Sequence, residues 1–312
     1  MKKCIFAGLT IFAIFFPCLV FAGDQALEGT PVPAAPGESF GSAERWLHEN
    51  NLSLTTSPEQ AFIDDYIIVA GEGLPARIAT SSGERRLTAE RAATVMAYRQ
   101  MTEMLYGVSV SGDTLVGGAT DQRDVVRTAV SGFIKGSEVV HKEYNEREGV
   151  ALVILKLGRS GPAGFGSVLY RHILGDPSLK KGMIGEGKPF LPTPPAVLAA
   201  PYDGLIIDAS SQAFRPALIN RIMNGRGEML YDPSKVSQKI LVERGCGEYT
   251  NSVGKAKEAL ESRGVKNALV VKASGTSNST DLLVSDDDAI RIFSADQKVG
   301  FFGQARVAFV LK

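Results

Sequence analysis

Residues 66–157 decide the fold, and they begin with YIIVAGEG (66–73) followed by RRLTAERAATVMAYRQMTEMLYG (85–107). The first run is typical of a strand. The second has apolar residues at helical spacing, with Arg91 and Arg99 mostly on the opposite side. Its alanine-rich apolar side predicts a helix that approaches a sheet closely. That side consists of Ala89, Ala93, Met96, Ala97, Met101, Met104 and Leu105.

The rest of this stretch predicts a second helix and a hairpin. Gly107 is expected to end the first helix in the left-handed conformation, which costs glycine nothing because it has no Cβ. DQRDVVRTAVSGFIKG (121–136) predicts a helix from about Arg123, and SEVVHKEYNEREGVALVILKL (137–157) predicts two strands around a polar turn with Gly149. The unit is therefore expected to be α+β. The second helix would turn one apolar face inward, formed by Val125, Val126, Ala129, Val130 and Phe133.

The order of short motifs in this unit carries a resemblance. The motifs are GEG (71–73), ERAA (90–93), LYGVSV (105–110), GFIKG (132–136) and the closing hairpin. In this order and spacing, residues 63–158 resemble the Lpp-twenty lipoprotein family and the N-terminal domain of flagellar assembly protein T. The resemblance implies a non-enzymatic module of the bacterial cell envelope. In several relatives that module is attached to the outer-membrane parts of the flagellar motor.

The N-terminus has the pattern of a secretory signal peptide. Lys2 and Lys3 precede the apolar run IFAGLTIFAIFF (5–16), and the segment ends in small residues at Ala22. We therefore expect cleavage after Ala22 and export to the periplasm, either soluble or peripherally attached to the outer membrane. A permanent membrane anchor is the alternative, but the apolar core is short for a membrane span.

A lipoprotein signal is a further alternative, and here the sequence departs from its lipoprotein relatives. Phe15, Phe16 and Pro17 precede Cys18, where a cysteine that becomes lipid-modified needs small neighbours, and Cys4 lies too close to the start. Signal cleavage would leave Cys246 as the single cysteine, so that an intramolecular disulfide is excluded. We expect its thiol to be buried.

Composition argues against a polyanionic partner. The chain has 34 basic and 34 acidic residues, so its net charge is close to zero with or without the signal peptide. A nucleic-acid-binding protein normally carries a clear excess of positive charge.

The chain is expected to divide into two small domains. After the signal peptide (1–22), residues 23–42 form an unstructured spacer rich in Gly, Pro, Ala and Ser. The α+β domain spans 43–173, with Trp46 covering one of its edges. Residues 174–203 contain five prolines from Pro189 to Pro201 and are expected to form an extended linker.

Residues 204–312 alternate strand and helix patterns, which predicts an α/β sandwich. The expected strands are 204–209, 227–231, 267–274, 282–284 and 305–311. The expected helices follow Asp232-Pro233 up to Arg244, Ser252 up to Arg263, and Ser285 into the acidic first turn. A distant likeness of this half to the middle domain of flagellar assembly protein T is weaker than the N-terminal resemblance.

No set of residues predicts a catalytic, cofactor or metal site. His48, His141 and His172 lie on different elements and lack the spacing of zinc ligands. Gly71 and Gly73 lack the partners of a phosphate-binding loop and are assigned to turn geometry. Ser274–Thr280 lacks a nucleophile elbow and is expected to form a loop.

The nearest approach to a cation site is Asp286, Asp287 and Asp288, with Asp208 as a fourth oxygen donor. Helix capping explains the three acids better, because consecutive side chains on a helix point in different directions. The alternative function is a periplasmic ligand-binding protein or metal-dependent enzyme, whose site would lie near Asp208, Arg215 and these acids.

The expected function is that of a non-enzymatic envelope component, structural or involved in assembly, with envelope or flagellar basal-body proteins as partners. Exposed strand edges and hairpins also suit a homo-oligomeric ring. General envelope maintenance unrelated to flagella fits the same sequence features.

Overall fold

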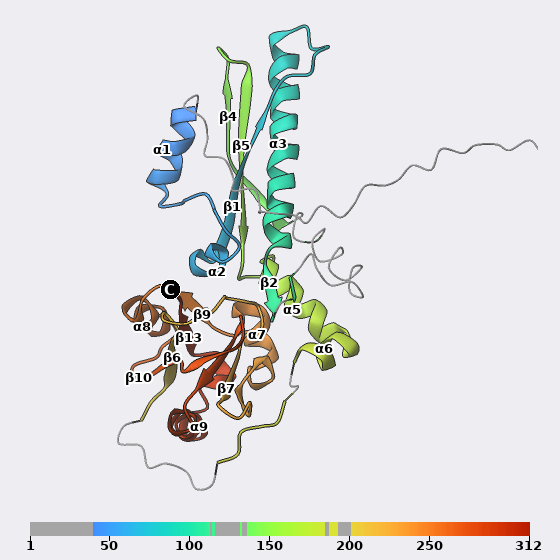
Figure 1. Ribbon diagram of the computed structural model, residues 1–312. Helices are drawn as coiled ribbons and strands as arrows, with labels where there is room; N and C mark the ends of the chain where they lie inside the picture. The colour runs from blue at the N-terminus through green and yellow to red at the C-terminus, as the bar shows by residue number, and fades with distance from the viewer. Residues whose placement is uncertain (1–39, 113, 116–131, 133–135, 185–186, 193–200) are drawn as a thin grey trace, which may run out of the picture.

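The N-terminal half is built on a three-stranded antiparallel sheet in the order β1-β5-β4 (Figure 1). The computed structural model describes residues 40–112, 114–115, 132, 136–184, 187–192 and 201–312. The elements of this half are α1 (Gly41–Glu49), α2 (Gln60–Asp64), β1 (Tyr66–Gly73), α3 (Ser82–Tyr106), β2 (Ser109–Ser111), β3 (Thr114–Leu115), β4 (Glu138–Asn145) and β5 (Val150–Gly158).

Helix α3 covers one face of this sheet at very close range. The predicted alanine face is confirmed, because Ala89, Ala93 and Ala97 are fully buried. Gly71 and Gly73 lie inside β1, so their assignment to a turn is wrong. A Cβ on Gly71 would lie 2.2 Å from the backbone nitrogen of Ala97, and a Cβ on Gly73 would lie 2.2 Å from that of Ala93. Small residues on both elements therefore let the helix backbone lie directly on the strand.

Two details of α3 differ from the prediction. Met96 was expected on the buried side, but its side chain is 37% exposed. It lies at the border of a face whose centre is occupied by alanines. Gly107 has φ −80° and ψ −9°, which is right-handed rather than left-handed. The reason for glycine here is space, because a Cβ would lie 2.6 Å from Cγ of Pro58.

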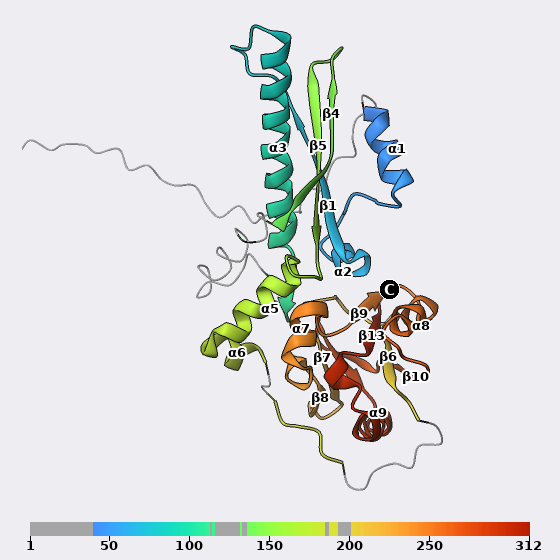
Figure 2. The ribbon, with the colours of Figure 1, turned by 180° about the vertical axis from the view of Figure 1, so that it is seen from behind.

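Helix α1 covers the opposite face of the sheet (Figures 1 and 2). Ala43 and Leu47 are buried against Ile68 of β1 and against Leu152 and Ile154 of the central strand β5. As predicted, Trp46 covers an edge of this domain. Its ring stacks on the ring of His141 in β4, with 5.4 Å between ring centroids. The hairpin of β4 and β5 is confirmed, and Gly149 in its turn has φ +67°.

Several predictions fall outside the described residues. They are the signal peptide at 1–22, nearly all of the spacer at 23–42, and most of the second helix predicted from Arg123 to Gly136. Two residues near the end of that stretch are described. A Cβ built on Gly132 would lie 3.8 Å from the side chain of Val168. Gly136 lies against Ala163.

The C-terminal half contains two four-stranded sheets, which confirms an α/β domain with a parallel sheet. One sheet is parallel throughout, in the order β10-β6-β13-β9. The other has the order β11-β12-β7-β8, in which only β12 and β7 run parallel. The strands are β6 (Gly204–Asp208), β7 (Arg221–Asn224), β8 (Met229–Tyr231), β9 (Glu248–Thr250), β10 (Ala268–Lys272), β11 (Gly275–Asn278), β12 (Asp281–Val284) and β13 (Val307–Val310).

The helices of this domain begin and end mostly where the sequence predicts. Ser252 caps α8 (Val253–Glu261) and Ser285 caps α9 (Asp286–Val299), each by accepting a hydrogen bond from a backbone N–H in the first turn. The helix predicted from Pro233 to Arg244 is instead two pieces. Asp232 caps a short 3-10 turn at Pro233–Lys235, the chain becomes extended, and α7 (Gln238–Arg244) follows.

Ser274–Thr280 is not only a loop, because four of its residues form β11. This strand lies at the edge of its sheet and is polar, which removes the hydrophobic alternation by which a strand is normally recognised.

The segment before β6 packs on the C-terminal domain. Helix α5 (Phe165–Gly175) contacts α7, and α6 (Pro177–Met183) lies within the range expected to be a linker. Further on, the chain pairs with β8, because the backbone N–H of Phe190 donates to the carbonyl of Met229 at 2.9 Å.

The two halves share one continuous hydrophobic core. The ring of Phe62 in α2 lies 5.1 Å from the ring of Tyr249 in β9. The N–H groups of Leu218 and Ile219 donate to the carbonyls of Ser109 and Val110 at 3.1 and 2.7 Å, so β2 reaches across the boundary. Figure 1 shows α2 and the lower end of the sheet resting on the C-terminal domain, while the hairpin and the start of α3 project away from it.

Candidate interaction surface

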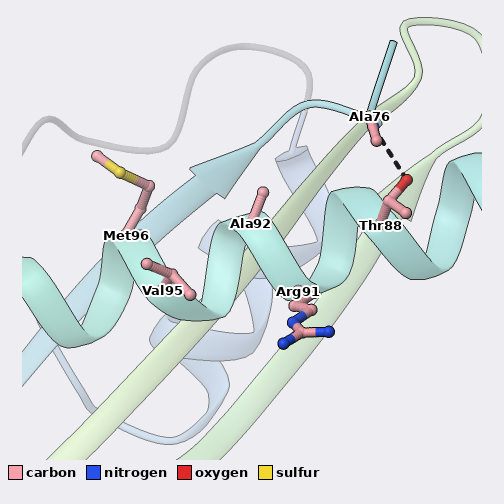
Figure 3. Close-up of a pocket in the computed structure, with 6 residues that line it drawn as sticks. All are labelled: Ala76, Thr88, Arg91, Ala92, Val95 and Met96. Carbon is pink, nitrogen blue, oxygen red and sulfur yellow. Dashed lines mark hydrogen bonds between the residues drawn. The ribbon is translucent and has the colours of Figure 1, made fainter. Parts of the chain in front are cut away.

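The side of α3 that faces away from the sheet carries two shallow hollows. The first has a volume of about 410 Å³ and the second about 470 Å³, and Val95 lines both. Figure 3 shows the first hollow, where Ala76 is held over the helix by a hydrogen bond from its N–H to Oγ1 of Thr88 at 3.1 Å. We call this surface the α3 outer face. It consists of Thr88, Arg91, Ala92, Val95, Met96, Tyr98, Arg99, Thr102, Glu103 and Tyr106.

Residues along the centre of this surface are spaced like the seam of a helix pair. Thr88, Ala92, Val95, Arg99, Thr102 and Tyr106 follow one another at alternating intervals of four and three residues. That spacing keeps side chains in one line along a helix, and it is the spacing of residues that contact a second helix. Three of the six, Thr88, Ala92 and Thr102, are small, which lets a partner approach the backbone. The line extends for roughly 27 Å at 1.5 Å per residue.

The apolar side chains here are open to solvent. Val95 is 55% exposed and Tyr106 is 42% exposed. Nearer the start of α3, Leu87 is 68% exposed, and Ile78 in the segment before the helix is 89% exposed. Single exposed apolar residues are ordinary, but several along one helix mark a contact surface.

The charges on α3 divide into paired and unpaired groups. Arg86 donates to Oε1 of Glu90 at 2.8 Å, and Lys142 of β4 lies 3.6 Å from the other oxygen of Glu90. The hydrogen bond from Arg86 lowers the pKa of Glu90. Within the described ranges, Arg91 and Arg99 have no such carboxylate partner. With respect to the described residues, the α3 outer face therefore presents two free guanidinium groups beside Val95.

The three histidines lie on separate elements, as the sequence indicates. His48 is in the last turn of α1, His141 is in β4 and His172 is in α5. His141 is engaged by Trp46, and its Nε2 lies 3.6 Å from Oε2 of Glu143. Among the residues that the structure describes, no three His, Cys, Asp or Glu side chains gather as metal ligands do.

Four residues of the alternative C-terminal site have local partners: Asp208, Arg215, Asp286 and Asp288. Asp208 accepts from the hydroxyl of Ser210 at 2.6 Å, and that hydrogen bond lowers the pKa of Asp208. Asp286 pairs with Arg226 at 3.7 Å, and Asp288 pairs with Arg291 at 2.7 Å. Arg215 lies 3.2 Å from Glu59 of the N-terminal half.

Cys246 is buried, as predicted. Its thiol donates to the carbonyl of Leu218 at 3.1 Å, and the hydroxyl of Tyr170 lies 3.6 Å from its sulfur. Burial raises the pKa of the Tyr170 hydroxyl well above its usual range. These contacts belong to the core between the two halves.

The sequence alone did not reveal the α3 outer face. The sequence pattern places Arg91 and Arg99 on the polar side of the helix and indicates no role for Val95. The available signal was an apolar residue placed four residues from each of two arginines. Such a residue cannot face the sheet when Ala93 and Ala97 do.

None of the helices in the described part of the chain combines the length and hydrophobicity that crossing a membrane requires. Although α3 has 25 residues, charged side chains recur along it.

Comparison with known families gives one finding. Residues 204–312 match the family model described as Treponema pallidum Tp0624, second domain. The match begins at the first residue of β6 and covers about a third of the chain. That description names no activity or ligand. A comparison of the whole sequence with curated proteins gives no match.

Proposed function

We propose that this protein is an exported, non-enzymatic component of the bacterial cell envelope that acts by binding another envelope protein. The observation that carries the proposal is the α3 outer face, a helix surface with exposed apolar residues at seam spacing and two arginines that have no ion-pair partner among the described residues. A helix surface of this kind suits protein contact rather than chemistry on a small molecule. The α3 outer face is then the binding surface of the N-terminal domain.

Two sequence features support the cellular setting. The N-terminal charge, apolar run and small residues are typical of a signal peptide, which favours a periplasmic protein. The motif order over residues 63–158 resembles the Lpp-twenty family and the N-terminal domain of flagellar assembly protein T. The partner assembly is accordingly the flagellar motor or another structure at the outer membrane.

Co-sedimentation tests this proposal. Hook–basal bodies purified from the host are probed for the mature protein with an antibody, beside a soluble periplasmic protein as the control. Enrichment with the basal bodies is expected. Enrichment with outer-membrane fractions alone would keep the envelope role and remove the flagellar one. Absence from both the basal bodies and the outer-membrane fractions, with the protein confined to the soluble periplasm, would contradict the proposal.

A further inference from the structure

We infer that the α3 outer face binds an acidic amphipathic helix of another protein, laid lengthwise along α3. This inference rests on the proposed function and specifies the partner's chemistry. The seam spacing and the small side chains at Thr88, Ala92 and Thr102 favour a helix over an extended segment, because a helix contacts positions that alternate by four and three. The choice between possible helices depends on the charges.

Arg99 lies in the seam itself, between Val95 and Thr102. A helix that covers the seam removes the guanidinium of Arg99 from water, and a buried charge without a partner is costly. Glu103, one turn further along, has no ion pair with it in the described part of the chain. The partner must therefore bring a carboxylate to Arg99.

A second copy of this chain does not meet that requirement. In an antiparallel pair that aligns the two seams, Arg99 faces Val95 of the second copy. In a parallel pair, Arg99 faces Arg99, and like charges repel. Self-association through this surface thus leaves Arg99 either without a carboxylate partner or facing Arg99 of the second copy.

The second arginine sets the spacing of the partner's charges. Arg91 lies eight residues before Arg99, which corresponds to roughly 12 Å along the helix. A partner helix with two carboxylates seven or eight residues apart pairs with both arginines, and small apolar residues between them fit over Ala92 and Val95. Bidentate pairing to arginine would also fix the register of the two helices.

In-cell photocrosslinking tests the inference in the full chain. A photoreactive amino acid replaces Val95, the cells are irradiated, and the crosslinked peptide is identified by mass spectrometry. The expected peptide comes from another protein and has two carboxylates at this spacing on one helical face. In the Arg91→Glu/Arg99→Glu variant the crosslink should weaken by about tenfold or more. Changing the two partner carboxylates to lysine should restore it.

The matched control is Lys255→Glu/Lys257→Glu on α8, which makes the same change of net charge on a different exposed surface. It should leave the crosslink unchanged, and a thermal melt of each variant shows that it folds. Four outcomes would each overturn the inference. They are a crosslink from position 95 to a second copy, a crosslink to residues 116–135 of the same chain, the absence of any crosslink, and a crosslink that survives the arginine reversal. If the inference is overturned but the protein still sediments with an envelope assembly, the proposed function stands without the inference. If the protein does not sediment with such an assembly, the proposed function and the inference both fail.

Discussion

At the scale of single residues, Gly71 and Gly73 set the distance between α3 and the sheet. Each faces backbone atoms of α3 rather than a flexible side chain, so an added methyl group cannot be accommodated locally. Gly73→Ala places its Cβ 2.2 Å from the backbone nitrogen of Ala93, and we expect the free energy of unfolding to fall by about 3 kcal/mol or more. Urea denaturation measures the loss.

Gly83→Ala is the control for this prediction. It lies in the first turn of α3 with nothing within 4 Å of its ideal Cβ. Because alanine is the better helix former, stability should stay the same or rise by up to about 1 kcal/mol. Equal losses at Gly73 and Gly83 would show that close backbone packing is not what Gly73 provides.

Asp281 gives the protein a pH dependence. Burial raises its pKa above the ordinary value of 3.8, against the opposing effect of Arg221, which lies 3.6 Å away. A carboxyl with a raised folded-state pKa contributes stability that is fully present below its ordinary pKa. That contribution is lost as pH rises through the raised value.

Asp281→Asn removes this titration. The unfolding free energy of the wild type minus that of the variant should therefore decrease as pH rises from about 3 to 6. Urea denaturation of both proteins across that range measures the difference. A difference that stays constant, or increases with pH, would contradict the assigned direction.

At the scale of elements, α1 is held on the sheet mainly by Ala43, Leu47 and the Trp46 ring over His141. Trp46→Ala should release this helix and lower stability by about 2 kcal/mol, less than the cost at a fully buried aromatic site because Trp46 is only half-buried. Limited proteolysis should then cut after α1, in the segment before α2.

Arg45→Ala is the matched control on the same helix, because Arg45 is exposed. Its proteolysis should match that of the wild type. Unchanged protection in Trp46→Ala would mean that the buried residues of α1 suffice to hold it.

The elements that the sequence predicted best have strong local signals. The alanine face of α3, the Gly149 hairpin and the serine caps of α8 and α9 each follow from residues close together in the chain. The elements it missed are decided by distant neighbours. Gly71 and Gly73 signal a turn until α3 is placed against them, and β11 is a strand only because β12 pairs with it. Val95 became informative only when the opposite side of α3 was seen to face the sheet.

At the scale of the whole molecule, the two halves are joined by polar as well as apolar contacts. Arg159, at the end of β5, lies 2.7 Å from Asp65 and 3.6 Å from Glu248 of β9. Its guanidinium also lies over the rings of Phe62 and Tyr249, at 6.0 and 5.7 Å. Burial acts to lower the pKa of Arg159, but the two carboxylates outweigh it and the net shift is upward. The chain therefore keeps a charge in its core to connect its halves.

This network predicts how the protein unfolds. With a continuous core, the wild type should unfold in one cooperative transition. Arg159→Met removes one of two cations from the carboxylate of Glu248, which keeps Arg263. The substitution should lower the unfolding free energy by about 1–3 kcal/mol and separate the unfolding of the N-terminal sheet from that of the C-terminal domain. Lys188→Met breaks the ion pair between the exposed Lys188 and Glu228 and should leave the unfolding free energy nearly unchanged. Calorimetry of the wild type and the two variants measures the number of transitions and their stability. A single transition of equal stability in both variants would mean that Arg159 does not couple the two halves.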